Sequence, residues 1–244
     1  MRLPKRIDHR LVDTIIRVQF VPGVPPETVP GYVHSLWRDR FISSFPDRSP
    51  KLRVGLSDLL IEPQSTLFFL TNDNKFRIDV DGSAITFNSV SDYAGWDRLR
   101  EVFNECIEPL FLNGIVRQVE RLGVRYINRF DQVRIFDHLD ITVKIGGVVP
   151  GSNRQQVRAE FERNGFTSVL TLVNEYPAES VRSNTPSNNF FSLFDVDIIK
   201  FFDTNEPISY AALLSVLEDA HLEEKTIFFT LLNPDFLQTL NPLY

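Results

Sequence analysis

The clearest indication of the fold comes from the stretch Glu120-Arg121-Leu122-Gly123-Val124-Arg125-Tyr126-Ile127-Asn128-Arg129-Phe130. Its β-branched and aromatic residues favour a strand. Successive side chains of a strand point to opposite faces, so one face carries Arg121, Gly123, Arg125, Ile127 and Arg129. The other face carries Leu122, Val124, Tyr126, Asn128 and Phe130. We therefore expect a strand with a core-facing side and a row of guanidinium groups on the opposite side.

The size and composition of the chain are those of a folded globular protein. It has 244 residues, of which 43% are hydrophobic and 24% charged, and this mixture argues against disorder. A chain of this length can bury a substantial core, as one large domain or as two small ones. There are 21 phenylalanines against one methionine. An aromatic-rich core favours a fold that contains β-sheet.

Charge and cysteine usage limit the partners and the compartment. The net charge of −6 argues against a general nucleic-acid coat, which requires a basic field, although it leaves room for a local basic stripe. The single cysteine, Cys106, excludes an internal disulfide and a cysteine-based zinc site. Residues 1–6 lack the apolar run of a signal peptide, and no segment reaches the ~20 apolar residues that span a bilayer. We expect a cytoplasmic protein with no membrane partner and no cofactor.

Hydrophobic periodicity divides the first half into strands and two helices. Ile16, Val18 and Phe20 alternate at the end of a predicted strand, and Asp81-Gly82 is a tight-turn dipeptide between two alternating runs. A helix is expected to begin at Trp96 and to end near 109–114, just before the arginine-containing strand. The other expected elements are a strand over 11–20, an amphipathic helix over 26–44, a loop over 43–50, strands near 59–61 and 67–71, and a hairpin over 75–90.

In the second half the strongest local signal is Asn164-Gly165, the dipeptide preferred in tight hairpins. A helix is expected to open at residues 207–209. Residues 225–232 are also compatible with a strand, but the 3.6-residue period continues through them, and Asn233-Pro234 reads as the start of a further short helix. The expected strands are 141–145, 157–163, 167–173 and 190–202, with loops over 146–151 and 177–189.

The order of these elements predicts an α+β protein. Hairpin, strand and long helix recur along the chain, so we expect two similar lobes, each an antiparallel sheet packed with a long amphipathic helix. The expected lobes are residues 1–135 and 136–244, packed as one compact unit. An internal duplication would account for the recurrence, although the residues of the two halves barely match.

The arginine row and Asn128 are the candidate binding residues. Guanidinium groups bind phosphates and carboxylates through paired hydrogen bonds, so Arg121, Arg125 and Arg129 are suited to an anion or an acidic partner. The structural alternative is that these arginines pair with nearby acids such as Asp131, which is the commoner arrangement. Asn128 lies on the core-facing side, where a buried amide needs partners and a structural hydrogen bond is the simpler interpretation.

No motif in the chain predicts a reaction. Asp195, Asp197 and Lys200 superficially resemble the layout of metal-dependent nucleases, in which carboxylates hold Mg²⁺. The lysine stands three residues after Asp197 instead of two, and a solvated strand face is the simpler interpretation. Nucleophile-elbow, phosphate-binding and dinucleotide-binding motifs are absent. Cys106 falls on the expected buried stripe of its helix and is interpreted as a small apolar residue. The sequence therefore favours a protein that is not an enzyme and has no metal ligands.

The strand motif and the order of elements resemble a known family. A strand of the form E-R-L-G-x-R-Y-I-N-R after a helix beginning at Trp96 is similar to the sporadically distributed bacterial family of unknown function, whose members are of about this length. The resemblance covers essentially the whole chain. It implies a bacterial or phage-borne accessory gene and carries over no catalytic residue. It rests above all on Arg121, Gly123, Arg125, Tyr126, Asn128 and Arg129.

Three functions are compatible with these features. The leading expectation is a non-enzymatic protein-interaction module that binds another protein or a second copy of itself, because interfaces concentrate binding energy in arginines and aromatics. The resemblance adds an association with a mobile-element or phage-defence cassette. The alternative is an anionic-ligand or nucleotide-sensing domain, with the arginine strand lining a pocket between the lobes. A metal-dependent nuclease using Asp195 and Asp197 ranks last.

Overall fold

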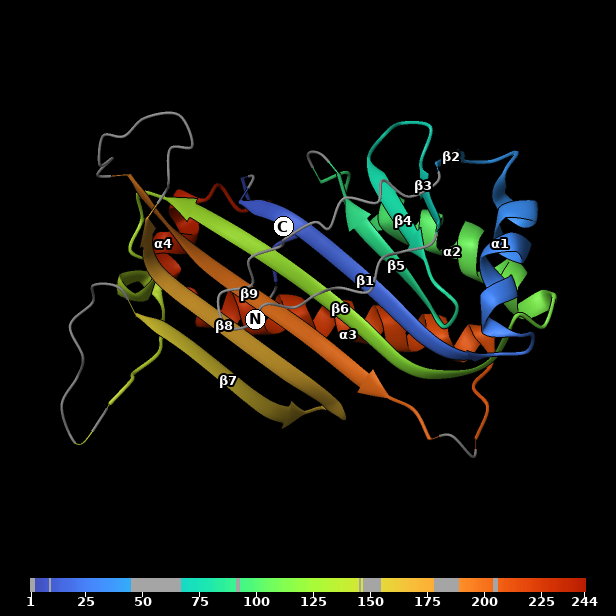
Figure 1. Ribbon diagram of the computed structural model, residues 1–244. Helices are drawn as coiled ribbons and strands as arrows, with labels where there is room; N and C mark the ends of the chain where they lie inside the picture. Colours follow the sequence, from blue (N-terminus) through green and yellow to red (C-terminus); the bar gives the residue numbers. More distant parts are fainter. Residues whose placement is uncertain are drawn as a thin grey trace. The chain divides into compact units, whose positions relative to one another are not determined.

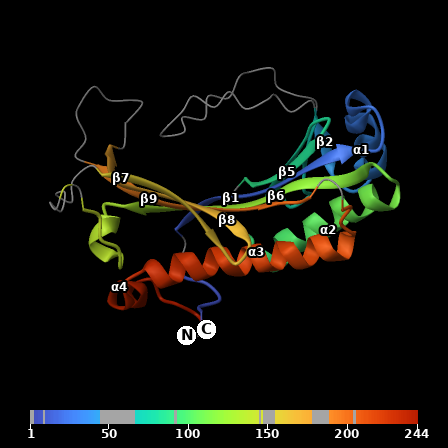
Figure 2. The same cartoon turned by 90° about the horizontal axis from the view of Figure 1, so that it is seen from below.

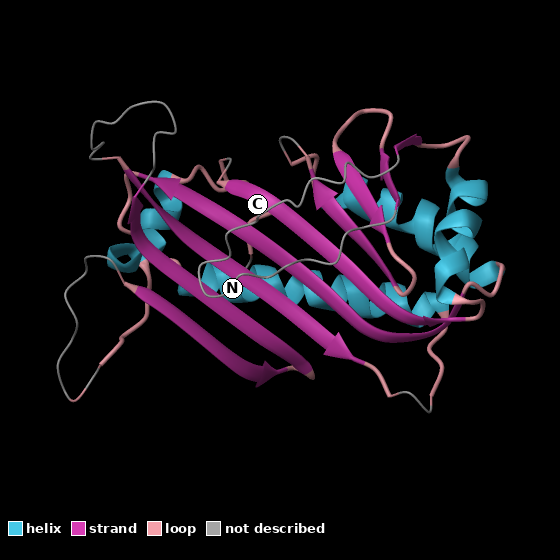
Figure 3. Ribbon diagram, viewed as in Figure 1, coloured by secondary structure: helices cyan, strands magenta, loops and turns pink. Residues whose placement is uncertain are grey.

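The fold is given by a computed structural model that describes residues 3–8, 10–44, 67–90, 93–144, 146, 155–177, 189–203 and 206–244. Antiparallel strands and four α-helices account for most of these residues (Figure 3). The α+β class expected from the sequence is therefore confirmed. The helices are α1 (Val29–Trp37), α2 (Trp96–Leu112), α3 (Tyr210–Leu231) and α4 (Pro234–Thr239), with 3₁₀ turns at Pro26–Thr28 and Ile135–His138.

Within the described residues, nine strands hydrogen-bond in the order β2-β3-β4-β5-β1-β6-β9-β8-β7 (Figure 1). Most neighbours in this order are also neighbours in sequence, and these neighbours pair antiparallel. The strands are β1 (Leu11–Pro22), β2 (Ile42–Ser44), β3 (Leu67–Leu70), β4 (Phe76–Val80), β5 (Ala84–Ser89), β6 (Val116–Asp131), β7 (Gln156–Arg163), β8 (Phe166–Pro177) and β9 (Phe190–Phe201).

The chain divides into two compact units, and neither is continuous in sequence. Unit 1 comprises Met1–Thr14, Gly123–Phe201 and Leu213–Tyr244, whereas unit 2 comprises Ile15–Leu122 and Phe202–Ala212. These bounds differ from the expected lobes, because strands β1 and β6 each contribute residues to both units. The expected lobes, residues 1–135 and 136–244, and their similarity stay a prediction.

Unit 2 encloses an apolar core between its strands and helices α1 and α2. The rings of Phe87 on β5 and Phe103 on α2 are 5.3 Å apart between centroids, and those of Trp37 and Phe69 are 5.1 Å apart. Helix α2 begins at Trp96, as the periodicity predicts. Its buried residues recur every three or four positions and form one stripe: Leu99, Val102, Phe103, Cys106, Ile107 and Leu110.

The β4–β5 hairpin in unit 2 is also confirmed, but its glycine has a different purpose from the one expected. The side chain of Asp81 accepts a hydrogen bond from the Ser83 N–H at 2.8 Å, which closes the turn. A Cβ atom on Gly82 would lie 2.7 Å from the carbonyl oxygen of Pro26. The glycine is therefore required by the close approach of another backbone segment.

The first helix is shorter than expected. The sequence predicts it over 26–44, whereas α1 ends at Trp37 and β2 begins at Ile42. The side-chain amide of Asn72 donates to the carbonyl of Arg40 at 3.2 Å, and β2 pairs with β3 in a register that places Ile42 opposite Leu70. These contacts with the β3–β4 region direct the chain away from the helix, and no local pattern reveals them.

In unit 1, residues 213–231 of α3 pack against one face of β8 and β9 (Figure 2). The rings of Phe194 on β9 and Phe228 on α3 lie 4.8 Å apart between centroids. The continuous 3.6-residue period is thus confirmed over the strand alternative for residues 225–232, all but the last of which are helical. The predicted cap of the next helix is also present, because Asn233 accepts a hydrogen bond from the Asp235 N–H at 2.9 Å.

The β7–β8 hairpin forms at the predicted dipeptide. Asn164 has a φ of 50° and Gly165 a φ of 78°, as a tight two-residue turn between right-twisted strands requires. The register places Arg163 opposite Phe166 and Gln156 opposite Val173. This turn therefore fixes which side chains of β7 face which side chains of β8.

The strand expected over 141–145 is wrong where it can be compared, because residues 141–144 form no strand. The preceding chain is bound to the end of α3 instead: the Asp140 N–H donates to the Leu231 carbonyl, and Leu139 forms a β-bridge with Leu232. The strand expected at 59–61 and nearly all of the loops at 146–151 and 177–189 lie outside the described residues. No helix in the described part of the chain is long and apolar enough to cross a membrane.

The first and last described segments of the chain meet within unit 1. Arg6 and Leu243 form an antiparallel β-bridge, in which the Leu243 N–H donates to the Arg6 carbonyl at 2.9 Å. The side chain of Asn241 donates to Asp8 at 2.6 Å. Unit 1 is therefore closed by contacts between residues at opposite ends of the sequence.

Candidate functional site

The arginine-containing strand has the two faces that the sequence predicts. Leu122, Val124, Tyr126, Asn128 and Phe130 are all buried, whereas Arg121, Arg125 and Arg129 are intermediate in exposure. The strand is longer than expected and runs over Val116–Asp131. Arg121 belongs to unit 2, and Arg125, Asn128 and Arg129 belong to unit 1.

Arg125 forms a paired ion pair with an acid 70 positions away in the chain. Its Nε donates to Oδ1 of Asp195 at 2.8 Å and its Nη2 donates to Oδ2 at 2.6 Å. The hydrogen bonds to Asp195 raise the pKa of Arg125 above its ordinary value, against the opposing effect of burial, and the charges of Asp197 and Asp13 add to the rise. Because the Asp195 side chain is only 10% exposed, this pair joins β6 to β9 as a structural contact.

Arg129 is held in a fixed orientation and is partly exposed, as suits a residue that contacts a partner. Its Nε donates to Asp131 at 2.8 Å, as the structural alternative predicts, and its guanidinium carbon lies 4.2 Å from the centroid of the Phe191 ring. The stacking and the ion pair together fix the orientation of the guanidinium plane. The Arg129 side chain remains 39% exposed. It can therefore meet a partner without first being ordered.

A small open hollow lies beside this arginine, and we call it the Arg129 hollow. The Arg129 N–H donates to the carbonyl of Arg10 at 2.7 Å, which brings the start of β1 next to the end of β6. Val12 on its wall is 53% exposed. The hollow has a volume of about 210 Å³ and is lined by Arg10, Leu11, Val12, Arg129, Asp131 and Val133, all in unit 1.

The acidic residues of β9 are not arranged to bind a metal. Both carboxylate oxygens of Asp195 receive hydrogen bonds from Arg125. The ammonium of Lys200 donates to the carbonyl of Gly165 at 2.8 Å and so belongs to the β7–β8 turn. Among the residues that the structure describes, no group of three or more histidines, cysteines and acids could hold a metal ion.

Cys106 is fully buried on the α2 stripe, as expected. Burial raises the pKa of its thiol well above the ordinary value, and the charge of Glu105 adds to that effect. The thiolate form, which a nucleophile requires, is therefore suppressed.

A group of titratable side chains lies on α3. The sequence places His221 on the apolar stripe of this helix, where a core histidine with a hydrogen-bond partner is the simplest interpretation, but Glu224 was not predicted. The hydroxyl of Tyr126 on β6 and Nδ1 of His221 are in hydrogen-bond contact at 3.1 Å. Burial, together with the charge of the neighbouring Lys225, lowers the pKa of His221 to about 3. Burial raises the pKa of Glu224 to about 8, with Lys225 opposing, so this carboxyl is largely protonated at neutral pH. Glu224 lies on the same helical stripe as Leu217 and Phe228, and that spacing was the available signal.

Glu223, the neighbour of Glu224, has a different role. Its side chain accepts a hydrogen bond from the Asn164 amide at 2.8 Å and pairs with Arg163 at 3.0 Å. The β7–β8 turn is therefore fastened to α3 by polar contacts, which the turn dipeptide alone does not predict.

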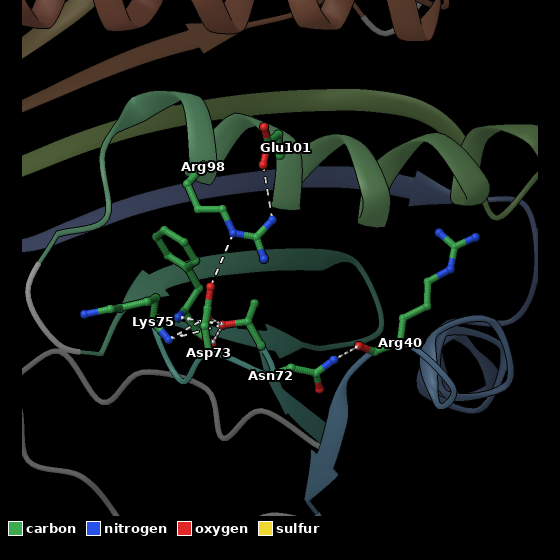
Figure 4. Close-up of polar contacts among 8 residues, drawn as sticks. Arg40, Asn72, Asp73, Lys75, Arg98 and Glu101 are labelled. Carbon is green, nitrogen blue, oxygen red and sulfur yellow. Dashed lines mark hydrogen bonds and ion pairs between the residues drawn. The ribbon is translucent and has the colours of Figure 1, made fainter.

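Unit 2 contains a second polar network, at the β3–β4 turn (Figure 4). The Thr71 hydroxyl donates to Asp73 at 2.5 Å, and Arg98 on α2 donates to the other oxygen of Asp73 at 3.3 Å and to Glu101 at 3.3 Å. Burial acts to raise the pKa of Asp73, but the hydrogen bonds from Thr71, the Lys75 N–H and Arg98 together lower it. Because these groups serve as one another's hydrogen-bond partners, we interpret the network as a structural contact that holds the β3–β4 turn to α2.

Comparison with known proteins adds no identification. No protein-family model matches the chain, and no curated protein matches it.

Proposed function

We propose that this protein is a non-enzymatic interaction module that binds another protein through the Arg129 hollow. The observation that supports the proposal is a guanidinium group held in place by Asp131 and stacked on Phe191 at the edge of a concave surface with an exposed valine. Arginines and aromatics in such settings commonly dominate binding energies at protein interfaces. The chemistry fits a partner that presents a carboxylate beside an apolar side chain.

The test compares two charge reversals in tagged full-length protein captured with its bound partners from its own host. Arg129→Glu is expected to lose a stoichiometric protein partner, because the substitution places a carboxylate where the partner's acid would bind. Arg100→Glu on α2 makes the same charge change at an exposed position of unit 2 and is expected to retain the partner. Equal recovery of the partner by both variants would remove the hollow as the interface.

Arg125→Glu is a poor test of binding, although the sequence points to this residue first. The substitution would place a carboxylate against Asp195, which is only 10% exposed and would lose its cation. A loss of binding in this variant would therefore reflect damage to the fold. Arg129 offers the same chemistry without that cost.

A small anionic ligand is the second candidate, supported by the two arginines that line the hollow. The volume of about 210 Å³ is below the ~300 Å³ at which drug-sized ligand sites begin, so the fit is to a small carboxylate or a single phosphate group better than to a whole nucleotide. A ligand at 100 times its Kd adds about 2.7 kcal/mol to the free energy of unfolding. A thermal-shift panel of phosphate, small carboxylates and nucleotides that leaves Tm unchanged would remove this candidate.

Three wider expectations remain part of the proposal. The resemblance to the sporadically distributed bacterial family supports an accessory role in a mobile-element or phage-defence cassette. The single cysteine supports a cytoplasmic location. The recurrence of hairpin, strand and helix supports an origin of the two expected lobes by duplication.

A further inference from the structure

The strand β7 ends the sheet on one side. It is the last strand in the hydrogen-bonding order, and within the described residues its neighbour is β8 alone (Figure 1). None of its eight residues is buried, whereas most residues of β8 are. Phe161, a large apolar side chain, is 36% exposed. Among the described residues no strand pairs with the outer edge of β7, and this edge presents a partly exposed side-chain surface.

The side chains of β7 alternate in a way that is complementary to the same strand running in reverse. The sequence is Gln156-Val157-Arg158-Ala159-Glu160-Phe161-Glu162-Arg163. If Ala159 is placed opposite Ala159 of a second copy, Arg158 faces Glu160 of that copy and Glu160 faces its Arg158. On the opposite face, Val157 meets Phe161 of the second copy. Directly opposed charges of unlike sign, and apolar pairs, stabilise antiparallel strands.

The neighbouring registers are unfavourable. A two-fold axis perpendicular to the sheet keeps each side chain on its own face, so the register can change only in steps of two residues. One step in one direction places Arg158 opposite Arg158. One step in the other places Glu160 opposite Glu160, and in that register Arg158 faces Glu162. Like charges in direct opposition destabilise a strand pair. The charges that protect an edge against indiscriminate pairing thus favour the register centred on Ala159 over the two adjacent ones, because it alone of the three opposes no like charges.

We propose that β7 is a self-association edge, where two copies of this protein join in antiparallel register centred on Ala159. The contact is isologous and closes at two copies, so it forms a dimer and no larger assembly. It involves one strand from each copy, so it belongs with the small interfaces, and we expect a Kd of about 10–100 µM. The proposal does not depend on the Arg129 hollow, which is formed by other strands.

The test is sedimentation velocity of the full chain from about 1 to about 300 µM, a range that brackets the expected Kd. The native protein is expected to shift reversibly from monomer to dimer. Arg158→Glu and Glu160→Arg each replace two attractive pairs by two repulsive ones, so each is expected to weaken the dimer by about tenfold or more. These side chains are 52% and 57% exposed, so both variants are expected to fold, which circular dichroism checks.

Two further samples distinguish this edge from any other interface. The double variant Arg158→Glu/Glu160→Arg restores opposite charges in the same register and is expected to dimerise like the native protein. An equimolar mixture of the two single variants is expected to form a heterodimer, because both pairs between positions 158 and 160 are then of unlike sign. Arg100→Glu is the control for net charge and is expected to leave the dimer unchanged.

Several outcomes would overturn the proposal. They are a monomer at every concentration, a dimer that Arg158→Glu leaves intact, a mixture of single variants that stays monomeric, and growth beyond the dimer.

Discussion

The two long helices differ in what they bury, and the difference separates the two units chemically. Helix α2 of unit 2 buries only apolar side chains and one thiol on its stripe. The part of α3 in unit 1 buries Glu223 and Glu224 among its apolar residues, and His221 contacts Tyr126. An apolar stripe contributes stability that does not depend on proton concentration. A stripe with shifted pKa values couples folding to pH.

The direction of this coupling follows from the two pKa values. Glu224 has a raised pKa of about 8 against an ordinary 4.5, so the stability it contributes is complete below pH 4.5 and is lost as the pH rises through 8. His221 has a lowered pKa of about 3 against 6.5, so its contribution is present above pH 6.5 and is lost as the pH falls through 3. The two effects oppose each other between pH 4.5 and 6.5, which is where unit 1 is expected to be most stable.

The largest expected change in the free energy of unfolding comes from the apolar stripe of α2. Phe103→Ala removes a fully buried ring that packs on Phe87, and we expect the free energy of unfolding to fall by about 3–5 kcal/mol. The loss should be the same at pH 5 and at pH 8, because no titratable group of the stripe changes charge in that range. Urea denaturation at the two pH values measures it. A loss that differs by more than about 1 kcal/mol between them would break the comparison.

The second-largest expected effect is the dependence of stability on pH that Glu224 causes. Between pH 6.5 and 8 the native protein is expected to lose about 2 kcal/mol of stability, from a slope of about 1.4 kcal/mol per pH unit. Glu224→Gln keeps a neutral side chain of the same shape and should remove this loss. Asp219→Asn, at an exposed position of the same helix, is the control and should leave the slope in place. Urea denaturation across this pH range gives both slopes, and parallel profiles for native protein and Glu224→Gln would contradict the assignment.

A smaller effect is expected at the histidine. His221→Gln loses the contact with the Tyr126 hydroxyl, so stability at pH 7 should fall by about 1 kcal/mol. The shape of the curve of stability against pH is the more sensitive measurement. Without His221, no group opposes the pH dependence that Glu224 causes. Stability should decline from pH 4.5 to 8 instead of being level up to 6.5. A level region that survives the substitution would show that His221 is not the opposing group.

The smallest effect compares a glycine from each unit. Gly165→Ala places a Cβ at a φ of 78°, and we expect a cost of about 1 kcal/mol, of which Gly165→Asn should recover part because asparagine tolerates this conformation. Gly82 is required for space beside Pro26, so Gly82→Asn should be at least as harmful as Gly82→Ala. Thermal unfolding of the four variants tests this contrast. If asparagine restored stability at both positions, the same cause would account for the need for glycine at both, and the contrast would be wrong.

Much of the fold could be predicted because the signals are local. The alternation in β6, the dipeptide Asn164-Gly165 and the periodic stripe of α2 each depend on residues within a few positions of one another. The predictions for the end of α1 and for residues 141–144 were wrong, because contacts with remote residues determine the structure there. Asn72 binds the Arg40 carbonyl, and the end of α3 binds Asp140. No window of sequence contains both partners of such a contact.

The candidate site was predicted in part for the same reason. The strand pattern identifies which arginines lie outside the core. The partner of Arg125 stands 70 positions away in the sequence, and Phe191 is also remote from Arg129. The contact with Asp195 makes Arg125 a structural residue, and the stacking on Phe191 orients Arg129 toward a binding partner. Glu224 was different, because its place between Leu217 and Phe228 on a helical stripe is visible in the sequence.

The bridge between Arg6 and Leu243 has a consequence for how the protein is made. A ribosome releases the segment up to Thr14 long before it reaches Leu243, so the opening of the chain must wait for its last described residues before unit 1 can close. The continuous interval Ile15–Leu122, which forms most of unit 2, is complete much earlier. Translation therefore makes Ile15–Leu122 available for folding before Leu243, the partner of Arg6, has been synthesised.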